Sequence, residues 1–172
     1  MHISLEKWGP RLVPSLAESA NDARIGLFLN DGFPFPYTQE SAKKFIDAVL
    51  KSPQDVHRAI VADGRAVGCV SLCRGRGVLS RTFELGYWLT PSLWNRGIAT
   101  QAVGQLCAAA FSETDAERIQ AQVFSTNPAS ARVLEKCGFV REAVLRRAVC
   151  KAENFCDLVV YARVRDREGE EK

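Results

Sequence analysis

The residues best suited to chemistry lie in one short stretch of the chain that begins at Glu84. Glu84 lies near the start of an expected strand over 83–89, and a carboxylate on a strand that faces a cleft can take a proton from an amine. The strand leads into the turn Arg96-Gly97-Ile98-Ala99, which begins an expected helix. A helix start presents unpaired backbone N–H groups and partial positive charge, so it suits a phosphate or pyrophosphate. Small residues at 97 and 99 would let such a ligand approach the backbone.

Two further polar residues, Asn127 and Ser130, lie at the start of the helix expected after the strand over 118–124. Asn127 is followed by Pro128, and asparagine at the N-cap with proline at the first helical position is a favourable start. Ser130 lies in the first turn of this helix, where it is either an ordinary first-turn residue or a hydrogen-bond donor to a ligand. Gly138 is expected to end the helix in the left-handed conformation.

The elements that must position these residues alternate between strands and helices. Periodicity and turn signals predict strands over 3–8, 58–62, 66–72, 83–89, 118–124, 139–149 and 154–164, and helices over 10–18, 21–29, 38–52, 97–110 and 127–138. This alternation indicates an α/β sandwich around a mixed sheet. Residues 1–165 are expected to form a single domain, and the charged residues 166–172 a tail that frays.

Length and composition exclude several classes of protein. At 172 residues, the chain is long enough for one domain with a sizeable core and too short for two ordinary ones. Its 47% hydrophobic and 25% charged residues are typical of a soluble globular protein. No apolar run approaches the roughly 18 residues of a membrane span, and no secretory signal is evident, so no membrane association is expected. A net charge of +3 does not favour nucleic-acid binding.

The chain contains six cysteines, whose spacing indicates neither a disulfide framework nor a zinc finger. No CxxC pair is present, and no histidine lies near a cysteine at zinc-finger spacing. Several of the cysteines fall inside apolar patterns, where cysteine behaves as a small hydrophobic residue. Free thiols in a reducing cytoplasm are therefore expected, and no metal site is predicted.

Three blocks of the sequence, taken in order and with their spacing, resemble the GNAT superfamily of acyl-CoA-dependent N-acetyltransferases. The blocks are FPFPYTQESAKKFI, ELGYWLTPSLWNRGIATQAV and RIQAQVFSTNPASARVLEKCGFV. Within this superfamily, the chain is most similar to the branch that includes the ribosomal-protein N-terminal acetyltransferases. The resemblance covers about residues 1–165.

The resemblance implies a mixed, mostly antiparallel sheet of six to seven strands with helices on both faces. Two neighbouring parallel strands would splay apart, and acetyl-CoA would enter the cleft between them from one side and an amine acceptor from the other. Coenzyme A binding is thereby expected of Trp88, Leu89, Thr90, Arg96, Gly97, Ile98, Ala99, Thr100, Asn127 and Ser130. The expected reaction is direct acetyl transfer from a thioester to an amine.

The resemblance also suggests catalytic roles. Glu84 occupies a position where this branch often places its base, although a solvated or ion-paired strand residue is the alternative. Many members carry a tyrosine as the acid that protonates the CoA thiolate, but the matching residue here is Leu134, which leaves Ser130 as the expected donor to the sulfur. Phe33 and Tyr37, with Glu84, are expected to bind the acceptor.

Two other functions remain compatible with the sequence. The missing tyrosine motivates one alternative, a catalytically silent module that binds acyl-CoA as a sensor or interaction domain, whereas Glu84 and Ser130 argue against it. A generic nucleotide-binding α/β enzyme is less favoured, because the turn lacks both GxxxxGK[ST] and GxGxxG. The acceptor is expected to be a protein N-terminus or a small-molecule amine, and the chain a monomer or a homodimer.

Overall fold

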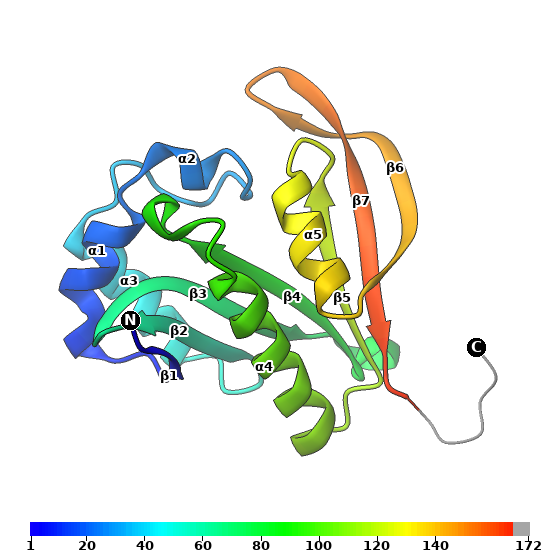
Figure 1. The fold of residues 1–172 in the computed structure, drawn as a ribbon, viewed down its shortest axis with the longest axis horizontal. Coiled ribbons are helices and arrows are strands. Elements are labelled where there is room, and N and C mark those ends of the chain that lie inside the picture. Colours follow the sequence, from blue (N-terminus) through cyan, green and yellow to red (C-terminus); the bar gives the residue numbers. More distant parts are fainter. Residues whose placement is uncertain (167–172) are drawn as a thin grey trace.

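The computed structural model describes residues 1–166, and the predicted tail over 166–172 lies almost wholly outside them. A seven-stranded mixed sheet in the order β1-β2-β3-β4-β5-β7-β6 forms the centre (Figure 1). Its strands are β1 (Ile3–Glu6), β2 (Val56–Ala62), β3 (Arg65–Arg74), β4 (Thr82–Leu89), β5 (Arg118–Phe124), β6 (Val140–Lys151) and β7 (Asn154–Val164). The helices are α1 (Val13–Ala20), α2 (Ala23–Gly26), α3 (Gln39–Leu50), α4 (Ile98–Glu113) and α5 (Pro128–Lys136), with short 3-10 turns η1 (Pro10–Leu12), η2 (Gly77–Leu79) and η3 (Pro91–Leu93).

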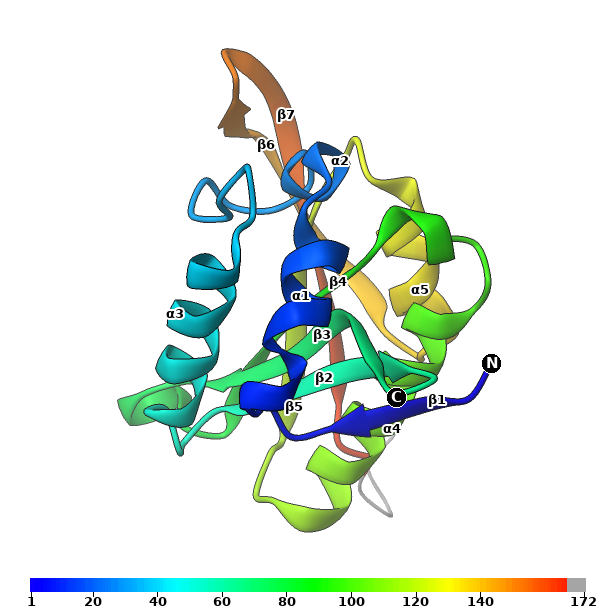
Figure 2. The same cartoon turned by 90° about the vertical axis from the view of Figure 1, so that its left-hand side faces the viewer.

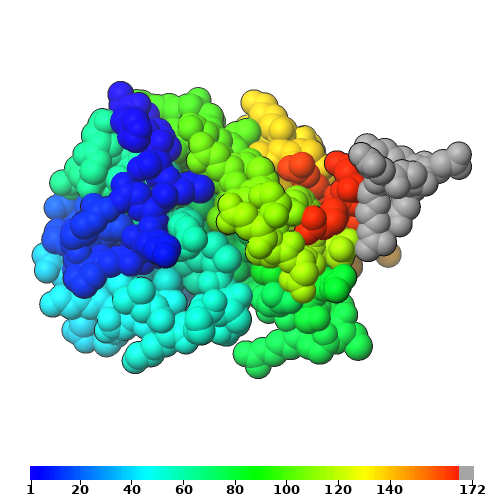
Figure 3. Space-filling view, turned by 90° about the horizontal axis from the view of Figure 1, so that it is seen from below, coloured from blue at the N-terminus to red at the C-terminus, as the bar shows by residue number. Residues whose placement is uncertain are grey.

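Helices cover both faces of the sheet, as predicted (Figure 2). α1 and α3 pack on one face and bury a cluster that includes Trp8, Leu16 and Ile46. α4 and α5 lie on the other face over a larger cluster that includes Phe83 and Ile119. Seen from below, the end of α4 lies between the N-terminal residues and the end of β7 (Figure 3). Among the described residues, no helix combines the length and apolarity needed to cross a membrane.

Local sequence signals explain most element boundaries. The Thr38 side chain accepts a hydrogen bond from the backbone N–H of Ser41, which caps α3. Asp63 and Gly64 both have positive φ, as a two-residue hairpin turn between β2 and β3 requires. Gly138 ends α5 with a φ of +81°, which confirms the predicted left-handed residue.

Only one strand pair in the described sheet is parallel, and this pair is short. β4 and β5 pair only at Thr82 with Arg118, Phe83 with Ile119 and Glu84 with Gln120. Beyond these pairs, β4 continues along β3 to Leu89, and β5 continues along β7 to Phe124. The predicted splayed parallel pair is therefore confirmed, and it leaves one edge of each strand facing a gap.

The two predicted N-terminal helices differ from the structure. The first begins with the 3-10 turn η1 and continues as α1 to Ala20. The second was expected over 21–29 but contains only the four residues of α2. Ile25 is the only residue of α2 that is buried, so the segment lacks an apolar face that would support a longer helix. Gly26 further lowers helix propensity at its end.

Candidate active site

The gap between β4 and β5 opens into a cavity of about 1020 Å³. Its walls are formed by the last residues of β4 and β5, the segment from η3 to the first turn of α4, α5, the region of α2 and the β6–β7 hairpin. Lys151 of β6 binds the Leu29 carbonyl and the Asp31 carboxylate, each at 2.7 Å, and so joins the hairpin to the loop after α2. The cavity is thus bordered by segments far apart in the sequence.

The start of α4 forms one wall of this cavity. Gly97 has a φ of +75° and is the N-cap residue, and no side chain caps the helix. The first helical bond is donated by the backbone N–H of Gln101 to the Gly97 carbonyl. Within residues 1–166, the N–H groups at 98, 99 and 100 therefore have no main-chain acceptor. These donors, with the positive end of the helix dipole, form an anion-binding arrangement.

Three exposed cations line the same cavity: Arg96, Arg132 and Lys136. Arg96 belongs to the turn before α4, whereas the other two lie on α5. Their charges reinforce the positive end of the helix dipole. The residues present therefore fit a ligand with several phosphate groups, as coenzyme A has.

The start of α5 brings a serine and a tyrosine together. The Asn127 side chain accepts a hydrogen bond from the Ser130 N–H at 3.1 Å, which confirms the predicted cap. The Tyr87 hydroxyl lies 2.7 Å from the Ser130 hydroxyl and 3.1 Å from the Ser130 carbonyl, to which it can donate. Burial raises the pKa of Tyr87 well above its usual value, so the phenol stays protonated at neutral pH.

Glu84 lies at the inner end of the cavity, at the last pair of the parallel ladder. Its carboxylate accepts a hydrogen bond from the Gln120 side chain at 2.9 Å. Burial raises the pKa of Glu84, and the bond from Gln120 and the charge of Arg118 partly offset this effect. A half-buried carboxylate with a raised pKa is suited to accept a proton near neutral pH.

A second cavity, of about 670 Å³, lies on the α3 side of β4. Phe33, Tyr37 and Trp88 line it, and the Phe33 ring lies 5.2 Å from that of Tyr37 and 5.7 Å from that of Trp88. His57 and Lys44 also line this cavity. Both cavities share the segment Gly86-Tyr87-Trp88, so the two spaces meet at the middle of β4.

Most of the predicted site residues line these two cavities, with one difference. The residues in the larger cavity are Glu84, Trp88, Leu89, Arg96, Gly97, Ile98, Ala99, Thr100, Asn127 and Ser130. Thr90 lines neither cavity, and its N–H is bound to the Val67 carbonyl at 2.8 Å. Glu84 was also expected to bind the acceptor; it borders the larger cavity, and its side chain lies on the same face of β4 as Trp88, which lines both cavities.

Sequence reasoning missed the Tyr87 hydroxyl. The expected tyrosine position on α5 is Leu134, which is fully buried in the core. Tyr87 reaches the same helix from β4 instead. Strand alternation could have indicated it, because Tyr87 packs with the cluster beneath α4 and α5, whereas Trp88 packs with the cluster beneath α1 and α3 and Glu84 shares the Trp88 face. Ser130, its partner, is 43 positions away along the chain.

Comparison with known families agrees with this geometry. A family model described as the acetyltransferase (GNAT) domain matches residues 2–140. The chain belongs to the GNAT acetyltransferase family. The predicted resemblance is therefore confirmed, as are the GNAT fold and its splayed strand pair.

Three similar proteins illustrate the range of this family. The chain is 38% identical over 88 residues to the uncharacterized N-acetyltransferase YoaA of Bacillus subtilis (strain 168). The aligned residues make up 51% of this chain and 50% of YoaA. It is 30% identical over 107 residues to the ribosomal-protein-serine acetyltransferase of Escherichia coli (strain K12). This alignment covers 62% of this chain and 59% of that enzyme. The chain thus spans between half and two thirds of the length of these two relatives. A structure of RimL, a ribosomal L7/L12 alpha-N-protein acetyltransferase in complex with coenzyme A, superposes with a TM-score of 0.84 at 22% identity, covering 94% of this chain and 93% of RimL.

Proposed function

We propose that this protein is an acetyl-CoA-dependent N-acetyltransferase that moves an acetyl group directly from the thioester to a primary amine. The observation that carries the proposal is the meeting of two cavities at Gly86-Tyr87-Trp88, where the parallel strands separate. One cavity contains an anion-binding helix start, and the other is lined by aromatic side chains. A donor and an acceptor that enter from the two sides would meet at this segment of β4.

The larger cavity is the proposed site for acetyl-CoA. The N–H groups at the start of α4 would hold the pyrophosphate, and Arg96, Arg132 and Lys136 would add positive charge near it. The free edge of β4 would offer backbone groups to the pantetheine arm. The Leu89 carbonyl on this edge already accepts a hydrogen bond from the Trp94 indole at 2.7 Å. The residues of β4 before Leu89 are therefore better partners for the pantetheine arm.

The chemistry requires a protonated amine to lose two protons, one before it attacks and one as the amide forms, and the departing thiolate to gain one. An aliphatic amine is mostly protonated at neutral pH, and Glu84 would take its proton, directly or through water. The amine nitrogen then bonds to the thioester carbonyl carbon, and the carbon–sulfur bond breaks. If Tyr87 donates to Ser130, the Ser130 hydroxyl is free to donate to the departing sulfur.

The proposed acceptor is an amine-bearing protein N-terminus or small molecule that reaches β4 through the second cavity. Phe33, Tyr37 and Trp88 would hold the group attached to the amine. Known relatives act on ribosomal proteins, as the names of the Escherichia coli enzyme and of RimL state. All six cysteines are free, which suits the reducing conditions of the cytoplasm, our proposed location.

The first test is a thermal-stability titration of the reduced protein with acetyl-CoA and, separately, with ATP. A ligand that binds only the folded state at 100 times its dissociation constant adds about 2.7 kcal/mol to the free energy of unfolding. We expect acetyl-CoA to stabilise the protein and ATP to have no effect. Thiol release is then measured with a panel of N-terminal peptides and small primary amines. Stabilisation without thiol release from any amine would favour the silent acyl-CoA-binding module, and no stabilisation would contradict both.

A further inference from the structure

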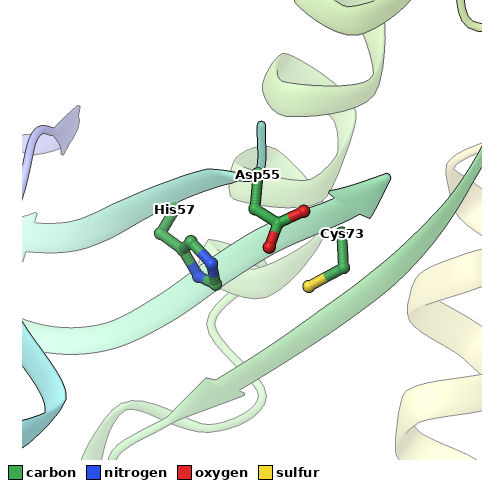
Figure 4. A group of neighbouring side chains, drawn as sticks. All are labelled: Asp55, His57 and Cys73. Atoms are coloured by element: carbon green, nitrogen blue, oxygen red, sulfur yellow. The ribbon is translucent and has the colours of Figure 1, made fainter. Parts of the chain in front are cut away.

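A histidine, a cysteine and an aspartate converge on the α3 side of the sheet, outside the proposed CoA site. Asp55 lies just before β2, His57 lies within β2, and Cys73 lies near the end of β3. Their potential ligand atoms all lie within 4.8 Å of one another. Figure 4 shows the three side chains directed into a common space, with the carboxylate between the imidazole and the thiol. We propose that Asp55, His57 and Cys73 form a binding site for a borderline-soft divalent cation such as Zn²⁺.

The donor set fits this class of metal. Zn²⁺ prefers cysteine sulfur, histidine nitrogen and carboxylate oxygen in tetrahedral arrangement, with bonds of about 2.0 to 2.3 Å. Those bond lengths place neighbouring ligand atoms roughly 3.3 to 3.6 Å apart. Side-chain rotations that move each ligand atom by about 1 Å would therefore bring all three to bonding positions. Cys73 is exposed and the other two are half-buried, so these side chains have room to adjust.

The surroundings hold one of the three ligands in place. The Asp55 carboxylate accepts a hydrogen bond from the Arg74 N–H at 2.9 Å, which orients it. Among the hydrogen bonds found within residues 1–166, none joins the three side chains to each other, so their ligand atoms are not engaged with one another. Arg74, the closest arginine in sequence to Cys73, is paired with Asp115. A bound cation would offset the negative charge of the Asp55 carboxylate at this site.

The location connects the proposed metal site to the acceptor side of the molecule. His57 lines the second cavity, and Cys73 pairs with Glu84 in the register of β3 and β4. Three protein ligands leave a fourth position of the tetrahedron open. That position would accept water or a small basic ligand.

The test uses Co²⁺ as a spectroscopic substitute for Zn²⁺ on the reduced protein, residues 1–172. One equivalent of Co²⁺ should produce a near-ultraviolet thiolate-to-cobalt charge-transfer band, and Zn²⁺ should abolish it because Zn²⁺ binds such sites more tightly. Cys73→Ser should remove the band, and Asp55→Asn and His57→Gln should each weaken Co²⁺ binding at least tenfold. Cys150→Ser changes another exposed cysteine and should leave the band intact.

Either of two outcomes would overturn the proposal. The first is the absence of a charge-transfer band in the unmodified protein. The second is a band that persists in Cys73→Ser or disappears equally in Cys150→Ser. Circular dichroism of each variant establishes that it is folded. Because the readout is metal binding and not acetyl transfer, the result is independent of the proposed enzymatic function.

Discussion

At the residue scale, Glu84 is the group on which the proposed reaction depends most. Glu84→Gln keeps the size of the side chain and can still hydrogen-bond to Gln120, but it cannot accept a proton. We expect kcat/KM for an amine acceptor to fall by about 10² to 10⁴-fold, the usual contribution of a general base. The acetyl-CoA thermal shift should be unchanged. An undiminished rate would show that another group or water alone accepts the proton.

The raised pKa of Glu84 adds a pH dependence with a definite sign. In the wild-type protein, the rate should rise with pH through this pKa, which lies above the ordinary value of 4.5, and Glu84→Gln should lose this rise. The folded state binds the Glu84 proton more tightly than the unfolded state does, because the pKa is raised on folding. Between pH 4.5 and the raised pKa, the stability of the wild-type protein should therefore fall with rising pH when compared with that of Glu84→Gln. Rate profiles and thermal melts recorded with a chelator measure both effects. A constant difference in melting temperature across this range would contradict the raised pKa.

Tyr87 and Ser130 are expected to act as one unit because their hydroxyls are 2.7 Å apart. Ser130→Ala should lower kcat by about 10²-fold. Tyr87→Phe should have a similar effect, because a Ser130 hydroxyl that no longer receives a hydrogen bond from Tyr87 can donate to other groups instead of the sulfur. The double variant should be no slower than the slower single variant. Steady-state kinetics at saturating acetyl-CoA test this. Losses that multiply would mean that the two hydroxyls act independently.

At the element scale, the start of α4 combines stability with ligand binding. Gly97 has a left-handed φ of +75°, and a Cβ there would meet nothing within 4 Å. Gly97→Ala should therefore cost about 1 to 2 kcal/mol of stability through backbone strain. It should also weaken acetyl-CoA binding, because a changed backbone at residue 97 would alter the orientation of the N–H groups of residues 98 to 100. Thermal melts with and without acetyl-CoA measure the two effects.

A matched control lies in the same helix. Gly104 is helical, and a Cβ there would lie 4.0 Å from the Cys137 sulfur, an ordinary contact. Gly104→Ala should raise stability by up to about 1 kcal/mol and leave acetyl-CoA binding unchanged. Equal effects of the two substitutions on acetyl-CoA binding would contradict a special role for the turn.

At the scale of the whole molecule, the two cavities predict that donor and acceptor binding can be altered separately. Phe33 lines the second cavity and contacts two other aromatic rings. Phe33→Ala should raise KM for the acceptor several-fold without changing the acetyl-CoA thermal shift. Phe35→Ala is the control, because Phe35 is 62% exposed and lines neither cavity. A loss of acetyl-CoA binding in Phe33→Ala would contradict the division between the cavities.

The sequence by itself determined the features that depend on neighbouring residues. The Thr38 and Asn127 caps, the Asp63-Gly64 turn and the left-handed Gly138 all follow from side chains within a few positions, because backbone preferences and capping bonds act over that range. The same holds for the strand–turn–helix around Gly97, which supplied the first indication of phosphate binding. The order of these local units was enough to indicate the fold.

Only the tertiary structure decided which side chains meet. Strand register and helix packing place Tyr87 against Ser130, and they place Cys73 beside Asp55 and His57. The same packing assigns Glu84 to the larger cavity and leaves Thr90 outside both. These contacts join residues that are many positions apart, and local conformational preferences carry no information about them. They arise where separate elements bury their apolar faces against one sheet, and that burial fixes the site.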